Sequence, residues 1–453
     1  MGHVATGRLF SQSARLSSAT LALLASTILG TAPAHAGKMR PTSIAAEKAT
    51  FEPSAAARFT CELRPFDLSK GLFCYGPAAI RSAYGLNGLL SSGSDGRGRT
   101  IVILDAFGSP TISDELKAFD QVYGLPDPPS FKIITMPGTP PFDPTDDNVV
   151  NWTGEIALDV QWSHAIAPAA SIVLVAAKSN DDVDLIDAFN YAVDHNLGDV
   201  ISMSFGESEA FLANPDGLDI VNAWTAAFEK ARAKHITLLV STGDQGSATQ
   251  DLPFQSTSFP STSPLVTAVG GTNLFFGTGG SADPNGTYQT ETVWNDPFGA
   301  GGGGMSILFK IPGYQEDAIP RSVQRTLHGN RGVPDVAYNG GVVGGVIVAW
   351  FVPFGPGAFF IFGGTSAGTP QWAGIVADLN SSTAKRLGSL NKRLYRLGRW
   401  GLLKPFFHDV TNGDNSFDGI PGYPATPGYD LSTGWGTPNL GKLGSAICDG
   451  DDD

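Results

Sequence analysis

Apolar runs alternate with amphipathic stretches through the middle of this chain, and this alternation limits the folds that the chain can adopt. The runs are typical of buried strands, and the stretches between them have helical spacing. We expect strands at residues 100–104, 171–177, 200–205 and 236–241, and helices at residues 113–123, 182–195 and 219–234. Such an order favours an α/β fold with a mostly parallel β-sheet and helices on both faces. Active residues are then expected at the carboxyl ends of the strands.

Length and composition are those of a large globular protein. The chain has 453 residues, which is enough for one large domain or two ordinary ones. Only 16% of the residues are charged, whereas Gly (56) and Pro (31) are abundant, as in a loop-rich enzyme. The formal net charge of −14 argues against a nucleic-acid partner, because phosphates would be repelled. Residues 278–304 are rich in Gly, Asn and Thr and are expected to form a long loop.

The first 36 residues have the pattern of a secretory signal peptide. Arg8 and Arg15 precede a short apolar run at residues 19–30, and a small-residue cleavage site ends at Ala36. The run is shorter than the roughly 20 residues that a transmembrane helix needs. We therefore expect a secreted protein, extracellular or periplasmic, with no membrane contact after signal removal. The expected parts are the signal peptide (residues 1–36), a short stretch before the main domain (37–74), the main domain itself (75–448) and an acidic tail (449–453).

If the protein is exported, its three cysteines enter a compartment where disulfides can form. Cys61 and Cys74 bracket a short loop and could form a disulfide in an oxidising compartment. Cys448, near the end of the chain, is then left over.

Ser366 occupies a turn between a predicted strand at residues 357–362 and a helix that is expected to begin at about Pro370. Proline suits a first helical turn, because the N–H that it lacks would have no partner there. The N–H groups at a helix start favour developing negative charge, and the flanking glycines let a substrate backbone approach. Ser366 is therefore a candidate nucleophile.

Two familiar arrangements of partners fit Ser366 poorly. Gly364-x-Ser366-x-Gly368 satisfies the nucleophile elbow of α/β-hydrolases, but only His408 lies downstream and too little alternating structure follows. A subtilisin-like triad would combine Ser366 with Asp105, at a strand end, and with His164. His164 lacks the sequence context of such a histidine, so this triad remains the second hypothesis.

A third arrangement uses carboxylates. Glu155 and Asp159 are i,i+4 neighbours in a run with helical spacing, so they share one helix face. Two acids one turn apart repel when both are ionised, which raises one pKa and lets them share a proton. Such a glutamate can act as a base at acidic pH, where a histidine would be protonated. Asp244, in a Gly-flanked turn after the fourth strand, could donate to an oxyanion while protonated.

In their order along the chain, these motifs resemble the sedolisin family of serine-carboxyl peptidases, which have a subtilisin-like fold. The resemblance runs from about Tyr75 to Ile447. It rests on Glu155-x-x-Leu158-Asp159, Ile166-Ala167-Pro168-Ala169-Ala170, Ser241-Thr242-Gly243-Asp244, Gly302-Gly303-Gly304-x-Ser306, Pro312-Gly313-Tyr314-Gln315, Arg331-x-x-Pro334-Asp335-Val336-Ala337 and Gly364-Thr365-Ser366-Ala367. The motifs that begin at Gly302, Pro312 and Arg331 look like the family's substrate-side segments.

The resemblance implies an acid-active endopeptidase that acts on peptides or unfolded proteins, and we expect a monomer. Glu155 would take the proton of Ser366, Asp159 would orient Glu155, and Asp244 would share the oxyanion with backbone N–H groups. Asp105 stands where some relatives place a further acid, but we favour a role in capping the turn that follows it. The family usually has a long pro-segment, for which this chain has only residues 37–74. A catalytically silent binding protein of the same fold is the alternative from another class.

The resemblance also implies one Ca²⁺ ion near the end of the chain. Its ligands would be the carboxylates of Asp409 and Asp430 and the backbone carbonyls of Val410, Thr426 and Gly428. Carboxylate and carbonyl oxygens are the ligands that Ca²⁺ requires. Asp414 and Asp418 make a different, local cation loop conceivable.

Overall fold

The structure is a computed structural model that describes residues 38–52, 58–276, 287–400 and 405–448. Residues 37–453 form one compact unit. The predicted signal peptide and the predicted acidic tail lie outside the described residues. No helix among those described is long and apolar enough to cross a membrane.

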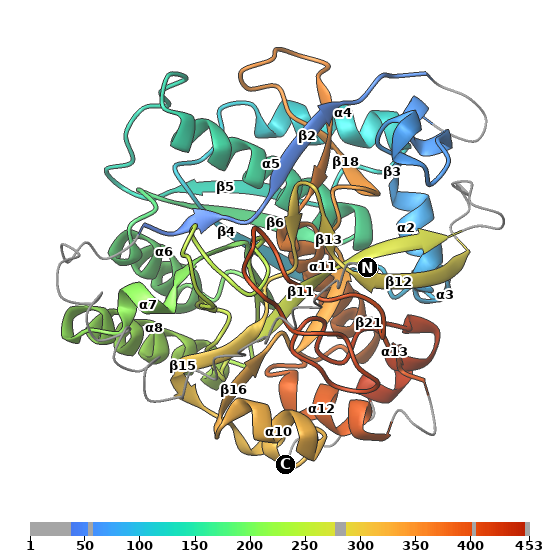
Figure 1. The fold of residues 1–453 in the computed structure, drawn as a ribbon. Helices are drawn as coiled ribbons and strands as arrows, with labels where there is room; N and C mark the ends of the chain where they lie inside the picture. The colour runs from blue at the N-terminus through green and yellow to red at the C-terminus, as the bar shows by residue number, and fades with distance from the viewer. Residues whose placement is uncertain (1–37, 53–57, 277–286, 401–404, 449–453) are drawn as a thin grey trace, which may run out of the picture. The chain divides into compact units, whose positions relative to one another are not determined.

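The core of this unit is an eight-stranded sheet (Figure 1). Its order is β12-β11-β9-β7-β4-β6-β5, with β17 also paired to β11. All its pairings are parallel except that of β11 with β12. The strands are β4 (Thr100–Ala106), β5 (Phe131–Thr135), β6 (Ser171–Ala177), β7 (Val200–Met203), β9 (Thr237–Ser241), β11 (Thr267–Phe276), β12 (Tyr288–Val293) and β17 (Val336–Asn339).

Helices cover both faces of the sheet, as the alternating side chains of β4 show. Ile101 and Ile103 belong to the core cluster that contains helices α4 (Ile112–Tyr123), α5 (Asp147–Ile166) and α11 (Thr365–Thr383). Val102 and Leu104 belong to the cluster of helices α6 (Asp182–Asp194) and α8 (Pro215–Ala233). Side chains alternate between the two faces of a strand, so the two clusters lie on opposite faces. The predicted α/β fold class is confirmed.

Two smaller sheets bring the N-terminal residues against this core. The sheet of order β1-β8-β10 joins β1 (Arg40–Pro41) to β8 (Phe205–Ser208) and β10 (Ser258–Phe259). The sheet of order β2-β19-β18-β3 joins β2 (Ile44–Lys48), β19 (Phe359–Gly363), β18 (Gly345–Ala349) and β3 (Cys74–Tyr75). We call residues 38–48, which run from β1 into β2, the N-terminal segment; it is the blue ribbon that leads into β2 in Figure 1.

Shorter elements complete the unit. They are α2 (Pro77–Ala83), α3 (Leu86–Ser91), α7 (Glu209–Leu212), α9 (Gly313–Glu316), α10 (Arg321–Leu327), α12 (Asn391–Trp400), α13 (Leu440–Cys448), β13 (Asn295–Asp296), β14 (Gly299–Ala300), β15 (Gly304–Lys310), β16 (Asn330–Val333), β20 (Phe407–His408), β21 (Thr437–Pro438), η1 (Thr60–Leu63) and η2 (Leu68–Lys70). Cys61 and Cys74 form the disulfide that the sequence allowed, and it ties η1 to β3.

Three sequence-based expectations need correction. Helix α11 begins at Thr365 rather than at about Pro370, so Pro370 lies inside the helix and Ser366 in its first turn. The strand expected at residues 200–205 is divided into β7 and β8 at Ser204. Of the long loop expected at residues 278–304, residues 278–286 lie outside the described residues, and the rest contains β12, whose pairing with β11 no local pattern indicated.

Candidate active site

Ser366 lies in the first turn of α11, just after β19. Its backbone continues directly from β19 through Gly364, which has a φ of 114°. A Cβ at residue 364 would lie 2.3 Å from Thr42 O and 2.7 Å from Asp244 Oδ2, so only glycine fits. The first turn of α11 therefore carries the serine hydroxyl and backbone N–H groups to one point, beside Asp244.

Helix α5 carries two carboxyl groups into the interior. Asp146 caps the helix by accepting hydrogen bonds from the N–H groups of Asn148 and Val149. The helix is buried almost all round from residue 149 onward, and the side chains of Glu155 and Asp159 have 0% exposure. A solvated face with two acids, which is the ordinary interpretation of this pattern, is therefore excluded.

Asp105, at the carboxyl end of β4, joins the two acids of α5 to form a buried acid cluster. Burial raises the pKa of Asp105 to about 8, and it raises the pKa values of Glu155 and Asp159 well above their usual range. The charge of Asp105 raises the pKa values of both α5 acids further. The nearby hydroxyls of Ser366 and Ser43 lower the pKa of Glu155, although none of the three carboxyl groups makes a hydrogen bond of ordinary geometry with a described residue.

The expectation that Asp105 caps the turn after β4 is wrong. Neither of its carboxylate oxygens accepts a hydrogen bond from any described residue. Its side chain points into the acid cluster, where repulsion between neighbouring carboxylates favours protonated forms.

Asp244 lies on the loop after β9 and faces Ser366 from the other side. Its Oδ1 accepts hydrogen bonds from the N–H (2.8 Å) and the hydroxyl (3.0 Å) of Thr365. Its Oδ2 is buried and has no hydrogen-bond partner among the described residues. Burial raises the pKa of Asp244 to about 7, against the lowering effect of Thr365. A protonated Oδ2 would be a donor at the start of α11.

The N-terminal segment crosses this site as an extended strand. Thr42 donates its N–H to Ser204 O (3.1 Å), and its carbonyl accepts from the N–H of Ser366 (3.1 Å). The hydroxyl of Thr42 lies 2.7 Å from Ser366 Oγ and 2.5 Å from Ser241 Oγ. Before Thr42, β1 pairs antiparallel with β8, and after it, β2 pairs antiparallel with β19. The peptide bond between Thr42 and Ser43 thus lies over the nucleophile.

His164 and His408, the histidines of the two other arrangements, are engaged away from Ser366. The Nε2 atom of His164 lies 2.8 Å from Pro126 O and 3.4 Å from Asp120 Oδ1, and burial lowers the pKa of His164 to about 4. The ring of His408 stacks on Tyr288 at a centroid distance of 3.7 Å. Neither ring makes a hydrogen bond to Ser366, whose hydroxyl contacts Thr42 and Ser204.

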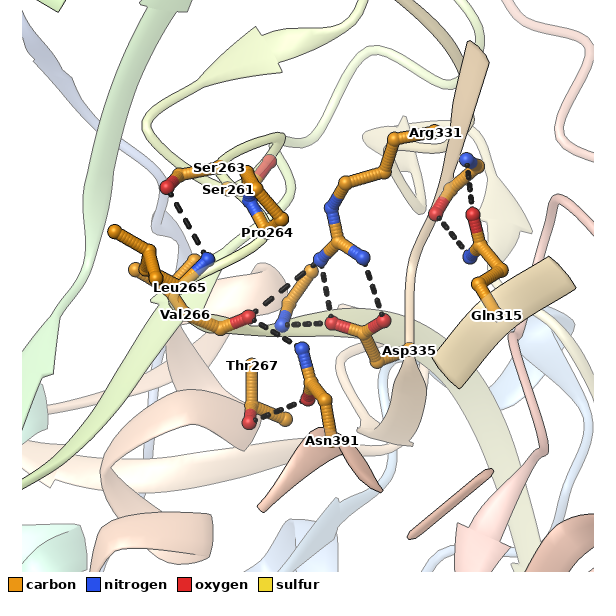
Figure 2. A network of polar contacts seen from close by, with 12 residues as sticks. Ser261, Ser263, Pro264, Leu265, Val266, Thr267, Gln315, Arg331, Asp335 and Asn391 are labelled. Carbon is orange, nitrogen blue, oxygen red and sulfur yellow. Dashed lines mark hydrogen bonds and ion pairs between the residues drawn. The ribbon is translucent and has the colours of Figure 1, made fainter. Parts of the chain in front are cut away.

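The Arg331–Asp335 motif is structural rather than part of the cleft. Both side chains are fully buried and form a two-pronged ion pair with distances of 3.1 and 2.7 Å (Figure 2). Asn391 bonds Val266 O and Thr267 beside the pair, and Gln315 bonds the backbone of β16 (Figure 2). This network fixes α9, α12 and β16 to the sheet. The glycine run 302–304 does approach the site, since the N–H of Gly302 donates to Gly243 O on the Asp244 loop.

The expected calcium ligands lie on two chain segments, 409–410 and 426–430, that contact each other. Asp409 accepts from the N–H of Gly428 (3.0 Å), and Asp430 accepts from the N–H of Thr426 (2.9 Å). Burial raises the pKa of Asp430 to about 6. Among the described residues, no three His, Cys, Asp or Glu side chains gather as a metal site, so a cation here would depend on backbone carbonyls such as that of Val410. Two carboxylates with adjacent carbonyls fit the hard-oxygen preference of Ca²⁺. Asp414 bonds locally to Ser416.

Sequence reasoning missed the N-terminal segment and the serines that bind it. Ser204 directly follows β7 and Ser241 ends β9, so the rule that parallel strands deliver functional groups at their carboxyl ends would have found them. No comparable signal predicted that β1 pairs with β8 and β2 with β19. Strand β1 has only two residues, and β2 has the sequence Ile-Ala-Ala-Glu-Lys, which does not alternate as a strand usually does.

Comparisons with known proteins identify the family of the chain. The family model of the subtilases matches residues 150–391, more than half of the chain. Kumamolisin from Bacillus sp. (strain MN-32) is 32% identical over 372 residues, 80% of this chain and 62% of its own. Sedolisin from Pseudomonas sp. (strain 101) is 31% identical over 373 residues, 79% of this chain and 59% of its own. The chain thus spans about six tenths of the length of these relatives.

A solved structure extends the match to three dimensions. The Pseudomonas sedolisin, a serine-carboxyl proteinase complexed with two molecules of pseudo-iodotyrostatin, superimposes with a TM-score of 0.69 at 29% identity. The match covers 83% of this chain and 98% of that one.

Proposed function

The chain belongs to the sedolisin family, within the subtilases, and from this we propose that it is a serine-carboxyl endopeptidase that hydrolyses peptides or unfolded proteins at acidic pH. The observation that carries the proposal is the position of Thr42. Its carbonyl accepts a hydrogen bond from the N–H of the candidate nucleophile Ser366. The carbonyl oxygen and Oδ2 of Asp244, which has no partner among the described residues, both border the space where a Cβ of Gly364 would stand. A peptide of this chain thereby occupies the position of a substrate.

The chemistry follows from the groups that surround that carbonyl. Ser366 Oγ bonds to the carbonyl carbon while its proton passes to Glu155, and Asp159 holds Glu155 in place. The negative oxygen accepts hydrogen bonds from Ser366 N–H and from protonated Asp244. Glu155 returns the proton to the leaving amine as the C–N bond breaks. Water then attacks the acyl-enzyme, with Glu155 again as the base, and releases the acid and Ser366.

Acidic conditions fit the charges of the site. Asp244 donates only while it is protonated, and a buried acid cluster tolerates ionisation poorly. A histidine would carry a positive charge at such a pH and could not accept the proton of Ser366. The predicted signal peptide fits a secreted enzyme that meets its substrates outside the cytoplasm. We propose that this enzyme acts as a monomer.

A single Ca²⁺ ion, held by Asp409 and Asp430 and by the carbonyls of Val410, Thr426 and Gly428, is part of the proposal. When bound, the ion would stabilise the loop between the two carboxylates. It has no part in the chemistry, because the expected ligands make none of the contacts described around Ser366.

The test is hydrolysis of an unfolded protein between pH 3 and pH 8 by the wild type and by Ser366→Ala. We expect hydrolysis at acidic pH by the wild type, and none by the variant at the same melting temperature. Activity that persists in the variant would refute the mechanism. A wild type that binds unfolded protein at every pH without cleaving it would establish the silent binding protein instead.

A further inference from the structure

A cavity of about 420 Å³ lies beside the N-terminal segment, next to the catalytic residues. Its protein walls come from α5 and from the sheet that contains β19: Asn148, Asn151, Gly154, Trp350 and Phe362. Its remaining wall is the N-terminal segment itself, with Arg40, Pro41, Ser43 and Ala45. A volume of this size is typical of a site for a small ligand or a large side chain.

The direction of the segment decides which of its residues faces the cavity. Thr42 directs its hydroxyl to Ser366 and Ser241, away from the cavity. The Cδ1 atom of Ile44 lies 3.0 Å from where a Cβ of Gly299 would stand, on the opposite wall of the cleft. Ser43 and Ala45, which alternate with them, line the cavity. Ser43, the residue that follows the peptide bond over Ser366, therefore lies on the cavity side of the segment, with its hydroxyl close to Glu155 of α5.

The residues at these two positions are small. Serine and alanine side chains leave the cavity open although the backbone is in place, so the segment occupies the cleft without filling it. A peptide with a large side chain at the position of Ser43 would remove additional apolar surface from water on the same backbone path.

The walls select an aromatic group. The rings of Trp350 and Phe362 meet edge to face, with centroids 5.6 Å apart at 79°. Trp350 is held by a hydrogen bond from its Nε1 to Thr153 Oγ1 (3.0 Å). Gly154 keeps the space open, because a Cβ there would lie 3.3 Å from the Trp350 ring. The amides of Asn148 and Asn151 complete this wall. Arg40 of the N-terminal segment also lines the cavity, and its guanidinium pairs with Asp251 at 3.4 Å. Fixed rings with neutral amides suit an aromatic side chain.

We propose that this cavity is the subsite for the first residue of the leaving peptide, and that it prefers an aromatic side chain there. The inference rests on the proposed peptidase function. It names Trp350, Phe362 and Gly154 as residues that determine specificity, and it makes the N-terminal segment, with Ser43, a weaker occupant of the cleft than an aromatic substrate.

The experiment compares two peptides that follow the path of the segment. One has the sequence of residues 39–45, and the other has Phe in place of the residue that matches Ser43. Both are offered together to the full-length protein at acidic pH, and mass spectrometry locates the cleaved bond. The ratio of kcat/KM values in a mixture does not depend on how many protein molecules have an open cleft. We expect the Phe peptide to react at least about tenfold faster, at the bond before Phe.

A variant connects the preference to the cavity. Asn151→Phe introduces a ring into the cavity wall and should bring the ratio close to one by slowing the Phe peptide. Gln121→Phe, the same change on the exposed surface of α4, should leave the ratio at its wild-type value. A wild-type ratio near one, cleavage at another bond, or a preference that survives Asn151→Phe would overturn the inference. Equal cleavage of both peptides still supports the peptidase, whereas failure to cleave these peptides and unfolded protein alike removes the proposed function itself.

Discussion

Replacing Asp244 by asparagine should remove the alkaline limb of the pH–rate profile. In the wild type, Oδ2 of Asp244 lies beside the carbonyl that stands over Ser366 and donates only while protonated. The pKa of Asp244 is raised to about 7, so the protonated fraction is nearly complete at pH 5 and about one tenth at pH 8. The contribution of this donor should then fall about tenfold for each further pH unit. An asparagine amide donates at every pH.

The structure indicates that asparagine can take this place without rearrangement. Oδ1 of Asp244 already accepts two hydrogen bonds from Thr365, which fixes the orientation of the side chain. An asparagine keeps these bonds with its carbonyl oxygen, and its NH₂ group then replaces Oδ2. Asp244→Ala loses both features. The loss of one oxyanion donor costs about 10²–10³ in kcat, and the N–H of Thr365 loses its acceptor at a cost of about 1–3 kcal/mol in stability.

The assay measures kcat/KM for one peptide from pH 3 to pH 9 with the wild type, Asp244→Asn and Asp244→Ala. Near-UV circular dichroism at each pH confirms that the protein is folded. Asp219→Asn, the same change at an exposed position of α8, is the control and should reproduce the wild-type profile. The reasoning fails if Asp244→Asn keeps the alkaline limb of the wild type, or if the wild type is most active near pH 8, as histidine chemistry would require.

Three further predictions test the neighbouring claims. Glu155→Gln should be nearly as damaging as Ser366→Ala, and Asp159→Asn less so, while His164→Ala keeps activity; kinetics with the reverse order would restore the subtilisin-like triad. The melting temperature should fall as the pH rises from 4 to 8, because the pKa values of Asp105 and Glu115 are raised to about 8 and about 7, so their stabilising protons are present below pH 4 and lost through pH 8. The buried Glu115 of α4 alone accounts for about 3 kcal/mol of the expected loss in unfolding free energy. His164, which is buried in its neutral form, has the opposite effect: it adds stability as the pH rises from 4 to 6.5. A melting temperature that rises toward pH 8 would contradict the prediction. A calcium chelator should lower the melting temperature of metal-loaded protein by removing a ligand of the folded state, and an unchanged melting curve would argue against the site.

The parts of the fold that depend on local periodicity were predictable. Strand β6 spans the predicted residues 171–177, because a buried parallel strand reads as a continuous apolar run. The start of α11 was not predictable from Pro370, since packing of the first turn against the Asp244 loop and the N-terminal segment outweighs the hydrogen bond that proline lacks. The burial of α5 on all sides was signalled only weakly: its apolar residues are spread around the helix, but Glu155 and Asp159 also fit a solvated face.

The site was predictable only in pieces. Spacing placed Glu155 and Asp159 on one helix face, but Asp105 reaches them only through the neighbouring positions of β4 and α5 in the fold. The N-terminal segment contacts Ser366 across 324 positions of sequence, a pairing that no periodicity encodes. Local motifs therefore identified the reacting groups, whereas the path of the peptide and the cavity beside Ser43 required the structure.

The proposed mechanism needs two acids in opposite states, Glu155 without its proton and Asp244 with it, although burial raises the pKa values of both. The reaction itself separates them. As Ser366 attacks, negative charge develops on the oxygen beside Asp244, and a negative neighbour raises the pKa of that carboxyl group further. The proton leaving Ser366 simultaneously moves onto Glu155, whose buried anion loses its unfavourable charge. Both changes stabilise the transition state more than the bound substrate, and this difference is what accelerates a reaction. The buried acids thus favour catalysis because both Glu155 and Asp244 are protonated, and therefore uncharged, in the transition state.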